Sequence, residues 1–196
     1  MTARDAPAAH PIDPLIARRW SPRSFTAAPL PPGALDSLLE AARWAASSNN
    51  LQPWHLIVAR RDAEPDAFEK LIGVLSPNNQ SWARNAAVLL LSVARSHNPN
   101  NGNPMRHAWH DTGAAMAQLA LQAAALGLQA HQMAGYDAAA ARAAFAIPEG
   151  FDPVAAIAVG EPGPPEALPE ALAQRETAPR QRRPINEFAF FGSWKG

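Results

Sequence analysis

The chain has 196 residues, with 17 basic and 17 acidic side chains and a formal net charge of zero at pH 7. This balance argues against nucleic acid or an anionic membrane surface as the main partner. Cysteine is absent, which excludes disulfides, thiolate catalysis and zinc–thiolate sites, and the apolar runs fall far short of the roughly 20 residues that cross a bilayer. We therefore expect a cytoplasmic protein without a signal peptide, long enough for a sizeable core.

The first elements in chain order are a leader, two helices and a strand. We expect residues 1–11 to be a disordered leader. Asp13 is placed to cap a short helix that has Pro14 in its first position. Leucine and alanine side chains spaced as one helical face predict a helix over 34–46. The apolar run that follows predicts a buried strand over 55–60.

The middle of the chain predicts two more helices, a central strand and a long polar loop. Pro65 opens an amphipathic helix, and a polar turn is expected over 76–80. The apolar, partly β-branched run 88–93 predicts a central strand. Residues 96–105 hold four Asn, two Pro and one Gly, which indicates a loop of the kind that often forms a lid. The longest predicted helix covers 106–126 and ends before a glycine.

The helix over 106–126 is rich in small residues, so another helix can approach its surface closely. We expect this helix to be buried at a subunit interface. Strands are predicted over 128–133 and 153–160, and Asp137 is placed to cap a helix over 138–146.

The tail over 161–196 contains many of the chain's 20 prolines and lacks a clear periodicity up to Phe188. A tail without a core of its own must pack against something else, and a partner subunit is the natural candidate. Arg180-Gln181-Arg182-Arg183-Pro184 forms a basic cluster ahead of several aromatic side chains, which we expect to anchor the tail by packing. Neither an internal repeat nor a second domain is indicated, so a single domain is expected over 12–196.

The stretch from Ala46 to Trp54 is strongly polar and joins a predicted helix to a predicted strand. Its Ser, Asn and Gln side chains offer donors and acceptors without charge, and Pro53 is expected to push Gln52 towards an extended backbone. Such a loop can present a row of neutral hydrogen bonds to one flat ligand with polar edges. The alternative is an ordinary helix cap and turn, since Ser and Asn favour both.

The segment around Arg18, Arg19 and Arg23 holds three arginines in six positions. A guanidinium is a planar fork suited to phosphate or to a carbonyl edge. By itself the segment also fits a solvated basic turn.

The histidines leave further alternatives open. His107, His110 and Asp111 are spaced so that a helix could share a metal among them, but a third strong ligand is not evident and we expect no metal. His107 or Trp109 could instead line a substrate pocket beside the 96–105 loop. His55 and His131 lie in predicted strands, and we expect both to be packed and neutral.

Two segments in the first third of the chain resemble the nitroreductase family of FMN-dependent oxidoreductases. Arg19-Trp20-Ser21-Pro22-Arg23-Ser24-Phe25 resembles the N-terminal flavin segment, with Trp20 where a second Arg is common. Ser47-Ser48-x-Asn50-x-Gln52-Pro53-Trp54 resembles the central signature and is the most specific match, although Ala46 stands where Pro is frequent.

Two further segments extend the resemblance, which runs from about Ile12 to Trp194. Asp111 to Ala115, Leu126 to Leu128 and Gly135 to Asp137 resemble the dimer helix and the strand beyond it. Arg180-x-Arg182-Arg183-Pro184 resembles the phosphate-binding tail. Each match alone is weak, but four in the family's order are specific.

The resemblance implies an α+β fold in which helices wrap a mixed, mainly antiparallel sheet. It also implies an intertwined homodimer with FMN at the interface and an extended C-terminal arm, 161–196, that crosses to the partner. The implied cofactor-binding residues are Arg19, Trp20, Ser21, Arg23, Ser47, Ser48, Asn50, Gln52, Asn79, Ala134, Gly135, Arg180 and Arg182.

By position in the family's motifs, the arginine segment would meet the phosphate, ribityl and pyrimidine side of the flavin. The serines and amides of the polar loop would come from the other subunit. Asn79 would contact the pyrimidine edge, and backbone N–H groups around Ala134 and Gly135 would approach flavin N5. Many relatives have Glu at the position of Ala134, so only the backbone role carries over. Arg180 and Arg182 would hold the phosphate.

The residue types agree with FMN binding. Arginines suit the phosphate of FMN, whereas hydroxyls and amides suit its ribityl polyol and its ring, which has alternating donors and acceptors. The chain lacks a Gly-x-Gly-x-x-Gly loop and a Walker motif, which disfavours a Rossmann site or P-loop. No side-chain acid or base is assigned, because the flavin carries the hydride chemistry. The expected function is electron transfer from NADH or NADPH to a nitroaromatic, quinone or similar acceptor by a ping-pong mechanism. Alternatives are a specialised family member that dehalogenates, desaturates or cleaves a ring, and a flavin-binding protein without turnover.

Overall fold

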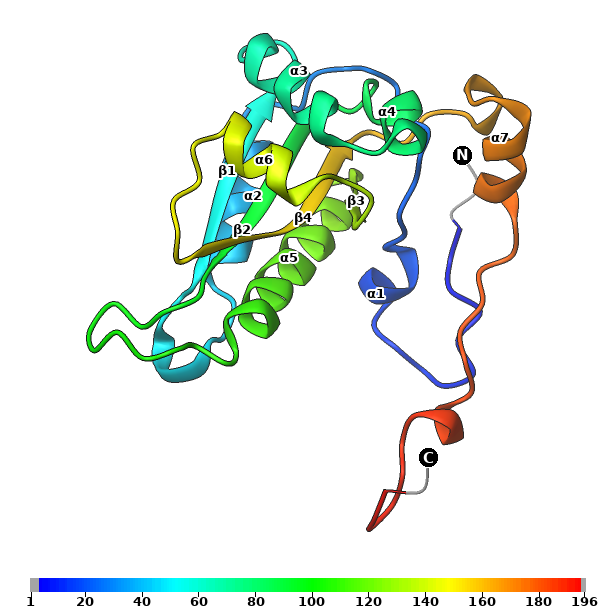
Figure 1. Cartoon of the computed structure of the whole chain (residues 1–196). Helices are drawn as coiled ribbons and strands as arrows, with labels where there is room; N and C mark the ends of the chain where they lie inside the picture. Colours follow the sequence, from blue (N-terminus) through cyan, green and yellow to red (C-terminus); the bar gives the residue numbers. More distant parts are fainter. Residues whose placement is uncertain (1–3, 195–196) are drawn as a thin grey trace.

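The computed structural model of the chain describes residues 4–194, and its centre is one four-stranded sheet (Figure 1). The strand order is β1-β2-β4-β3, and each neighbouring pair is antiparallel. The strands are β1 (Trp54–Arg60), β2 (Val88–Arg95), β3 (Gln129–Met133) and β4 (Phe151–Gly160). The expected α+β class and mainly antiparallel sheet are confirmed, and no parallel pair occurs among the described strands.

The position of each strand in the sheet explains its burial. β2 is central, and the first seven of its eight residues are buried. Its side chains point alternately into two hydrophobic cores. Leu89, Leu91 and Val93 lie in one core, and Val88 and Leu90 lie in the other. The prediction of a buried strand at 55–60 was wrong in part, because β1 is an edge strand and Ala59 is its only buried residue.

Helices cover both faces of the sheet (Figure 1). On one face, α2 (Ala34–Arg43) packs against α5 (Ala108–Ala125), and the contact buries Leu38, Met116 and Leu119. On the other face lie α3 (Pro65–Val74), α4 (Pro77–Ala83) and α6 (Ala138–Ala144). Asp137 caps α6 by accepting from the Ala140 N–H at 2.9 Å, as the sequence predicted.

Element boundaries differ from prediction where short local signals decide them. The helix predicted over 34–46 ends at Arg43, and the one predicted over 106–126 begins at Ala108. The predicted polar turn over 76–80 was wrong, because Pro77 begins α4 in the position where proline favours a helix start.

The remaining helices are short. They are α1 (Pro14–Arg18), which Asp13 caps as predicted, α7 (Glu170–Thr177), and the 3-10 turns η1 (Ser48–Asn50), η2 (Pro165–Ala167) and η3 (Ile185–Glu187). None of the described helices is long and apolar enough to cross a membrane.

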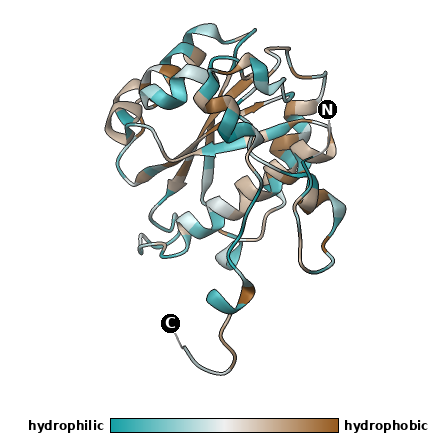
Figure 2. Ribbon diagram, turned by 90° about the vertical axis from the view of Figure 1, so that its right-hand side faces the viewer, coloured by the Kyte–Doolittle hydropathy of each residue, from teal (hydrophilic) through white to brown (hydrophobic). Residues whose placement is uncertain are grey.

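The first part of the tail packs on its own chain, which corrects the expectation that it needs a partner. Leu168 and Leu172 belong to the core, and Pro162 forms a β-bridge with Phe25. Beyond α7 the chain runs beside the N-terminal segment, and its end extends away from the body (Figures 1 and 2). There Phe188 and Phe191 are exposed, so only this distal part of the tail leaves apolar side chains without a core.

Candidate functional site

The arginine segment lies along the free edge of β3. The backbone N–H of Trp20 donates to Gln129 Oε1 at 3.0 Å, and Gln129 Nε2 donates to the Arg18 carbonyl at 3.3 Å. Further along β3, His131 Nδ1 lies 2.8 Å from the Pro22 carbonyl. The strand thus fixes the segment near Trp20 and at Pro22, and Arg19, Ser21 and Arg23 beside these points remain half-buried.

His131 is neutral at physiological pH. Burial, with smaller contributions from the Arg23 and Arg19 charges, lowers the pKa of His131 to about 4, although the bond to Pro22 opposes this shift. A carbonyl can only accept, so Nδ1 carries the proton and donates. The ring packs on Trp82 with 4.6 Å between centroids. The expectation of a packed, neutral His131 is confirmed. His55 is exposed at the edge strand, so the prediction that it is a core residue was wrong, although its ring lies edge-on to Phe151 with 5.0 Å between centroids.

Several guanidinium groups converge beside the arginine segment. Burial and the nearby charges of Arg180 and Arg182 lower the pKa of Arg19. Burial, Arg182 and Arg4 likewise lower the pKa of Arg180. Like charges brought this close repel one another, so the cluster favours an anion that would neutralise it.

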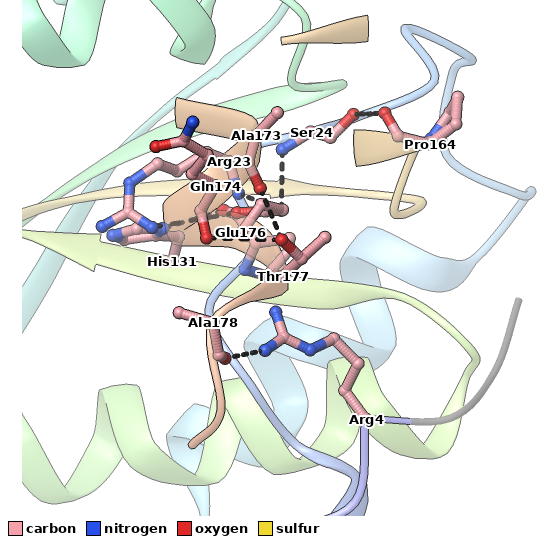
Figure 3. Close-up of polar contacts among 11 residues, drawn as sticks. Arg4, Arg23, Ser24, His131, Pro164, Ala173, Gln174, Glu176, Thr177 and Ala178 are labelled. Carbon is pink, nitrogen blue, oxygen red and sulfur yellow. Dashed lines mark hydrogen bonds and ion pairs between the residues drawn. The ribbon is translucent and has the colours of Figure 1, made fainter. Parts of the chain in front are cut away.

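Arg180 also holds the two chain ends together. Its Nη1 donates to the carbonyls of Arg4 and Ala17 at 2.6 and 2.7 Å, and its Nη2 donates to the Arg19 carbonyl at 2.9 Å. Arg4 donates in return to the Ala178 carbonyl (Figure 3). The Arg4 guanidinium also lies over the Trp20 ring, 4.9 Å from its centroid. Arg182 is exposed, and its Nη1 donates to the neighbouring Gln181 carbonyl at 2.7 Å.

Glu176, on the last turn of α7, is a site residue that the sequence reasoning missed. It is 1% exposed, and its Oε1 accepts from the backbone N–H groups of Arg23 and Ser24 at 2.8 and 3.1 Å (Figure 3). Its Oε2 lies 3.8 Å from Arg23 Nη1. The tail was predicted to lack periodicity, so nothing in the sequence pointed to one buried carboxylate within it.

Asn79 and Gly135 meet at the end of β3. The Gly135 carbonyl accepts from Asn79 Nδ2 at 3.0 Å and from the Ser76 N–H at 2.9 Å. A Cβ on Gly135 would lie 2.7 Å from Asn79 Nδ2 and 2.9 Å from Ser76 Oγ, so a larger residue here would have to displace these side chains. Ala134 beside it is exposed. The structure therefore brings Asn79, Ala134 and Gly135 together on the edge that also carries the arginine segment.

The polar loop 47–53 is held mainly through its backbone. The Ser48 N–H donates to buried Asp111 Oδ2 at 2.9 Å, and the Gln52 N–H donates to Ser47 Oγ at 3.0 Å. Asn49, Asn50 and Gln52 all have positive φ, which for Gln52 is 46°. The prediction that Pro53 makes Gln52 extended was wrong. Such left-handed residues cost about 1–3 kcal/mol each and cluster at functional sites.

The polar loop and the arginine segment lie at opposite ends of α5. Asp111, in the first turn of α5, binds the loop, whereas Gln129, which follows the last turn, binds the segment. From Asp111 to Ala125, the last residue of α5, the helix rises about 21 Å over 14 residues. The loop and the segment are therefore bound at well-separated places on one chain.

A pocket of about 260 Å³ lies where the 96–105 loop meets the polar loop. It is lined by Ser48, Asn98, Met105, His107 and Asp111 among others. Trp109 does not line this pocket, and its Nε1 lies 3.5 Å from Asp152 Oδ2.

The alternative of a metal site concerned His107, His110 and Asp111. His110 Nδ1 lies 2.9 Å from Asp111 Oδ1, and residues 4–194 contain no group of three or more His, Cys, Asp or Glu side chains placed to hold a metal.

Comparison with known proteins places this geometry in a family. The model of the nitroreductase family matches residues 16–161. The uncharacterized 15.4 kDa protein in the ask 5' region of Mycolicibacterium smegmatis is 39% identical over 144 residues, which are 70% of this chain and 95% of that protein.

Solved structures agree. A crystal structure described as an oxidoreductase containing FMN is 37% identical, covers 100% of this chain and 99% of its own, and has a TM-score of 0.93. At the level of the fold, a putative NAD(P)H:FMN oxidoreductase from Staphylococcus epidermidis is 20% identical over 90% of this chain and 93% of its own, with a TM-score of 0.74. The chain belongs to the nitroreductase family.

Proposed function

We propose that the protein is an FMN-dependent oxidoreductase that takes a hydride from NADH or NADPH. The observation that carries the proposal is the guanidinium cluster of Arg19, Arg180 and Arg182, where burial and then the neighbouring charges lower the pKa of Arg19 and of Arg180. A dianionic phosphate relieves that repulsion. The donor set around the cluster fits the rest of FMN, because Ser21 offers a hydroxyl, and Arg23 and Asn79 offer N–H groups along one edge.

Each residue has a proposed place on the cofactor. Arg180 and Arg182 hold the phosphate together with Arg19, and Ser21 and Trp20 line the ribityl chain. Arg23 faces the N1–C2 carbonyl edge of the ring, and Asn79 faces the pyrimidine edge. The backbone at Ala134 and Gly135 approaches N5, which the close packing of Gly135 against Ser76 and Asn79 permits.

When bound, FMN supplies the hydride and electron transfer. The chain's own residues bind and orient it, and Arg23 stabilises negative charge at N1 in the reduced ring. We propose that the nicotinamide and a nitroaromatic, quinone or similar flat acceptor use one cavity in turn, which gives ping-pong kinetics.

The proposed assembly is a homodimer in which the polar loop of one chain completes the site of the other. Ser47, Ser48, Asn50 and Gln52 lie in the loop bound at the start of α5, whereas the arginine segment is bound beyond the end of α5, so we propose that a second copy brings them to the flavin. Gly113 and Ala117 are exposed on α5 and offer a smooth face to a second copy. We propose that the distal tail, with exposed Phe188 and Phe191, crosses to that copy.

The test is the identity and redox behaviour of the bound cofactor. Protein denatured after purification should release FMN and not FAD.

A hydrogen bond to a charged group contributes about 1.5–3 kcal/mol, and about 30 mV corresponds to about 1.4 kcal/mol for two electrons. Arg23→Ala should therefore lower the midpoint potential of the bound FMN by roughly 30–60 mV. Arg182→Ala should weaken FMN binding with little change in potential, because the phosphate is charged in both redox states. A colourless protein that FMN cannot reconstitute would contradict the proposal.

A further inference from the structure

We propose that Glu176 is a positioning residue for Arg23 that also sets how much of the Arg23 charge reaches the bound ring. This inference rests on the proposed function. Glu176 lies in the tail, 153 residues from Arg23 in sequence, and joins α7 to the arginine segment through three contacts.

The first role of Glu176 follows from its Oε1. That oxygen accepts from two successive backbone N–H groups, those of Arg23 and Ser24, at 2.8 and 3.1 Å. Ser24 is further fixed because its Oγ donates to the Pro164 carbonyl at 2.7 Å. The turn that carries Arg23 is therefore held by the tail on one side and by the His131 bond to Pro22 on the other.

The second role follows from Oε2. This oxygen is buried and has no hydrogen-bond partner among the described residues. It lies 3.8 Å from Arg23 Nη1, close enough for an ion pair but too far for a hydrogen bond. The Arg23 side chain is 27% exposed, so its N–H groups remain available to a ligand while the carboxylate stays behind them.

A residue that only fixed the backbone at Arg23 and Ser24 would not need the negative charge of Glu176. A neutral amide oxygen would accept from the same two N–H groups, whereas burying a carboxylate is costly unless a nearby cation compensates it. The only cation in an ion pair with Glu176 among the described residues is Arg23. We infer that the carboxylate partly cancels the guanidinium charge, which weakens the preference of the site for the anionic, reduced ring over the neutral, oxidised ring.

Two substitutions separate the roles. Glu176→Gln keeps an oxygen for the two N–H groups and removes the charge. It should preserve the melting temperature and raise the ratio of reduced to oxidised FMN affinity about tenfold, which is about +30 mV for a two-electron couple. Glu176→Ala removes both the acceptor oxygen and the charge, so it should lower the melting temperature even without FMN. Because Glu176→Gln retains the oxygen, its melting temperature should equal that of the parent.

The experiment is a redox titration with saturating FMN, combined with thermal unfolding of the cofactor-free protein. Glu64→Gln is the matched control, because Glu64, whose side chain is 43% exposed, pairs with Arg60 at 2.7 Å near the opposite edge of the sheet. Its midpoint potential should equal that of the parent.

An unchanged or lowered potential in Glu176→Gln, from a parent that binds FMN, would overturn this inference alone. A parent that does not bind FMN would overturn both this inference and the proposed function.

Discussion

The arginine segment and the polar loop are built in opposite ways. The segment 19–25 is held by side chains from distant parts of the fold, namely Gln129, His131 and Glu176. The loop 47–53 is held mainly by backbone groups: the Ser48 N–H donates to Asp111, and the Pro53 carbonyl accepts from the Arg95 N–H. Three of its residues have left-handed conformations. Its amides at Asn50 and Gln52 are exposed and bond mainly to one another.

In the proposed two-chain site, this difference separates the half that each chain completes for itself from the half that its partner completes. The segment lies beside Arg180 and Arg182 of the same chain, so under the proposed function it would receive the phosphate and ring edge without a partner. The loop presents polar groups outward at the far end of α5, as an element built to meet another molecule would. The account therefore predicts that disturbing the segment changes the chain's own stability, whereas disturbing the loop mainly changes what the assembled dimer binds.

The largest expected effect lies under the segment, at His131. Its pKa of about 4 lies below the value of about 6.5 in the unfolded chain, so between these values the unfolded chain binds more protons. Stability is fully present above pH 6.5 and falls by up to about 3 kcal/mol as the pH drops to 4. Chemical denaturation at a series of pH values measures the slope.

His131→Asn should flatten that slope, because it keeps an N–H donor for the Pro22 carbonyl but cannot titrate. Gln132→Asn, at an exposed position of the same strand, is the control and should leave the slope unchanged, because neither side chain titrates. A His131 variant with the parent's acid slope would show that the segment is not held over a neutral imidazole.

The second effect concerns the loop, through its bond to Asp111. Asp111→Ala should destabilise the chain by about 1–3 kcal/mol, because the Ser48 N–H loses its charged acceptor. Hydrogen exchange at Ser48 should rise, and FMN binding should weaken although Asp111 lies far from Arg23 in the same chain. Asp111→Asn keeps an acceptor and should recover most of the loss.

Asp36→Ala is the matched control, because Asp36 is an exposed carboxylate in the first turn of α2. Slow exchange at Ser48 in Asp111→Ala would mean that the loop is fixed by other contacts.

The smallest effect tests the packing at the end of β3. Gly135→Ala forces the Asn79 side chain to move and to give up its bond to the Gly135 carbonyl, which should cost about 1 kcal/mol. Gly73→Ala should instead stabilise the chain by roughly 0.5–1 kcal/mol, because Gly73 lies within α3 with open space around it. Equal unfolding free energies for the two variants would contradict the close contact of Asn79 with Gly135.

The segment and the loop also differ in how far the sequence predicts them. Periodicity and caps predicted the central strand, the α5 helix and the Asp137 cap, because those signals act over a few neighbouring residues. Motif resemblance marked Arg19, Ser48 and the other proposed cofactor contacts. The support for those residues was not predictable in the same way, because Glu176 reaches Arg23 across 153 positions of sequence.

The conformation of individual backbone residues was the second feature that the sequence did not predict. Pro53 biases the preceding residue away from the helical region, but the loop holds Gln52 at a positive φ through the Ser47 hydroxyl and the amide of Asn50. Similarly, β1 has the composition of a buried strand, yet its place at the sheet edge leaves it half-exposed. Strand order depends on the whole fold, which a single stretch of sequence does not encode.

The most direct test of the two-chain site mixes chains that are defective in different halves. One chain carries Arg23→Ala and Arg182→Ala, and the other carries Asn50→Ala and Gln52→Ala, so that neither homodimer has an intact site. Co-expression with two different tags isolates the mixed dimer, whose FMN content is then measured. The account predicts one intact FMN site per mixed dimer, built from the segment of the second chain and the loop of the first. A mixed dimer that binds no FMN would contradict the account.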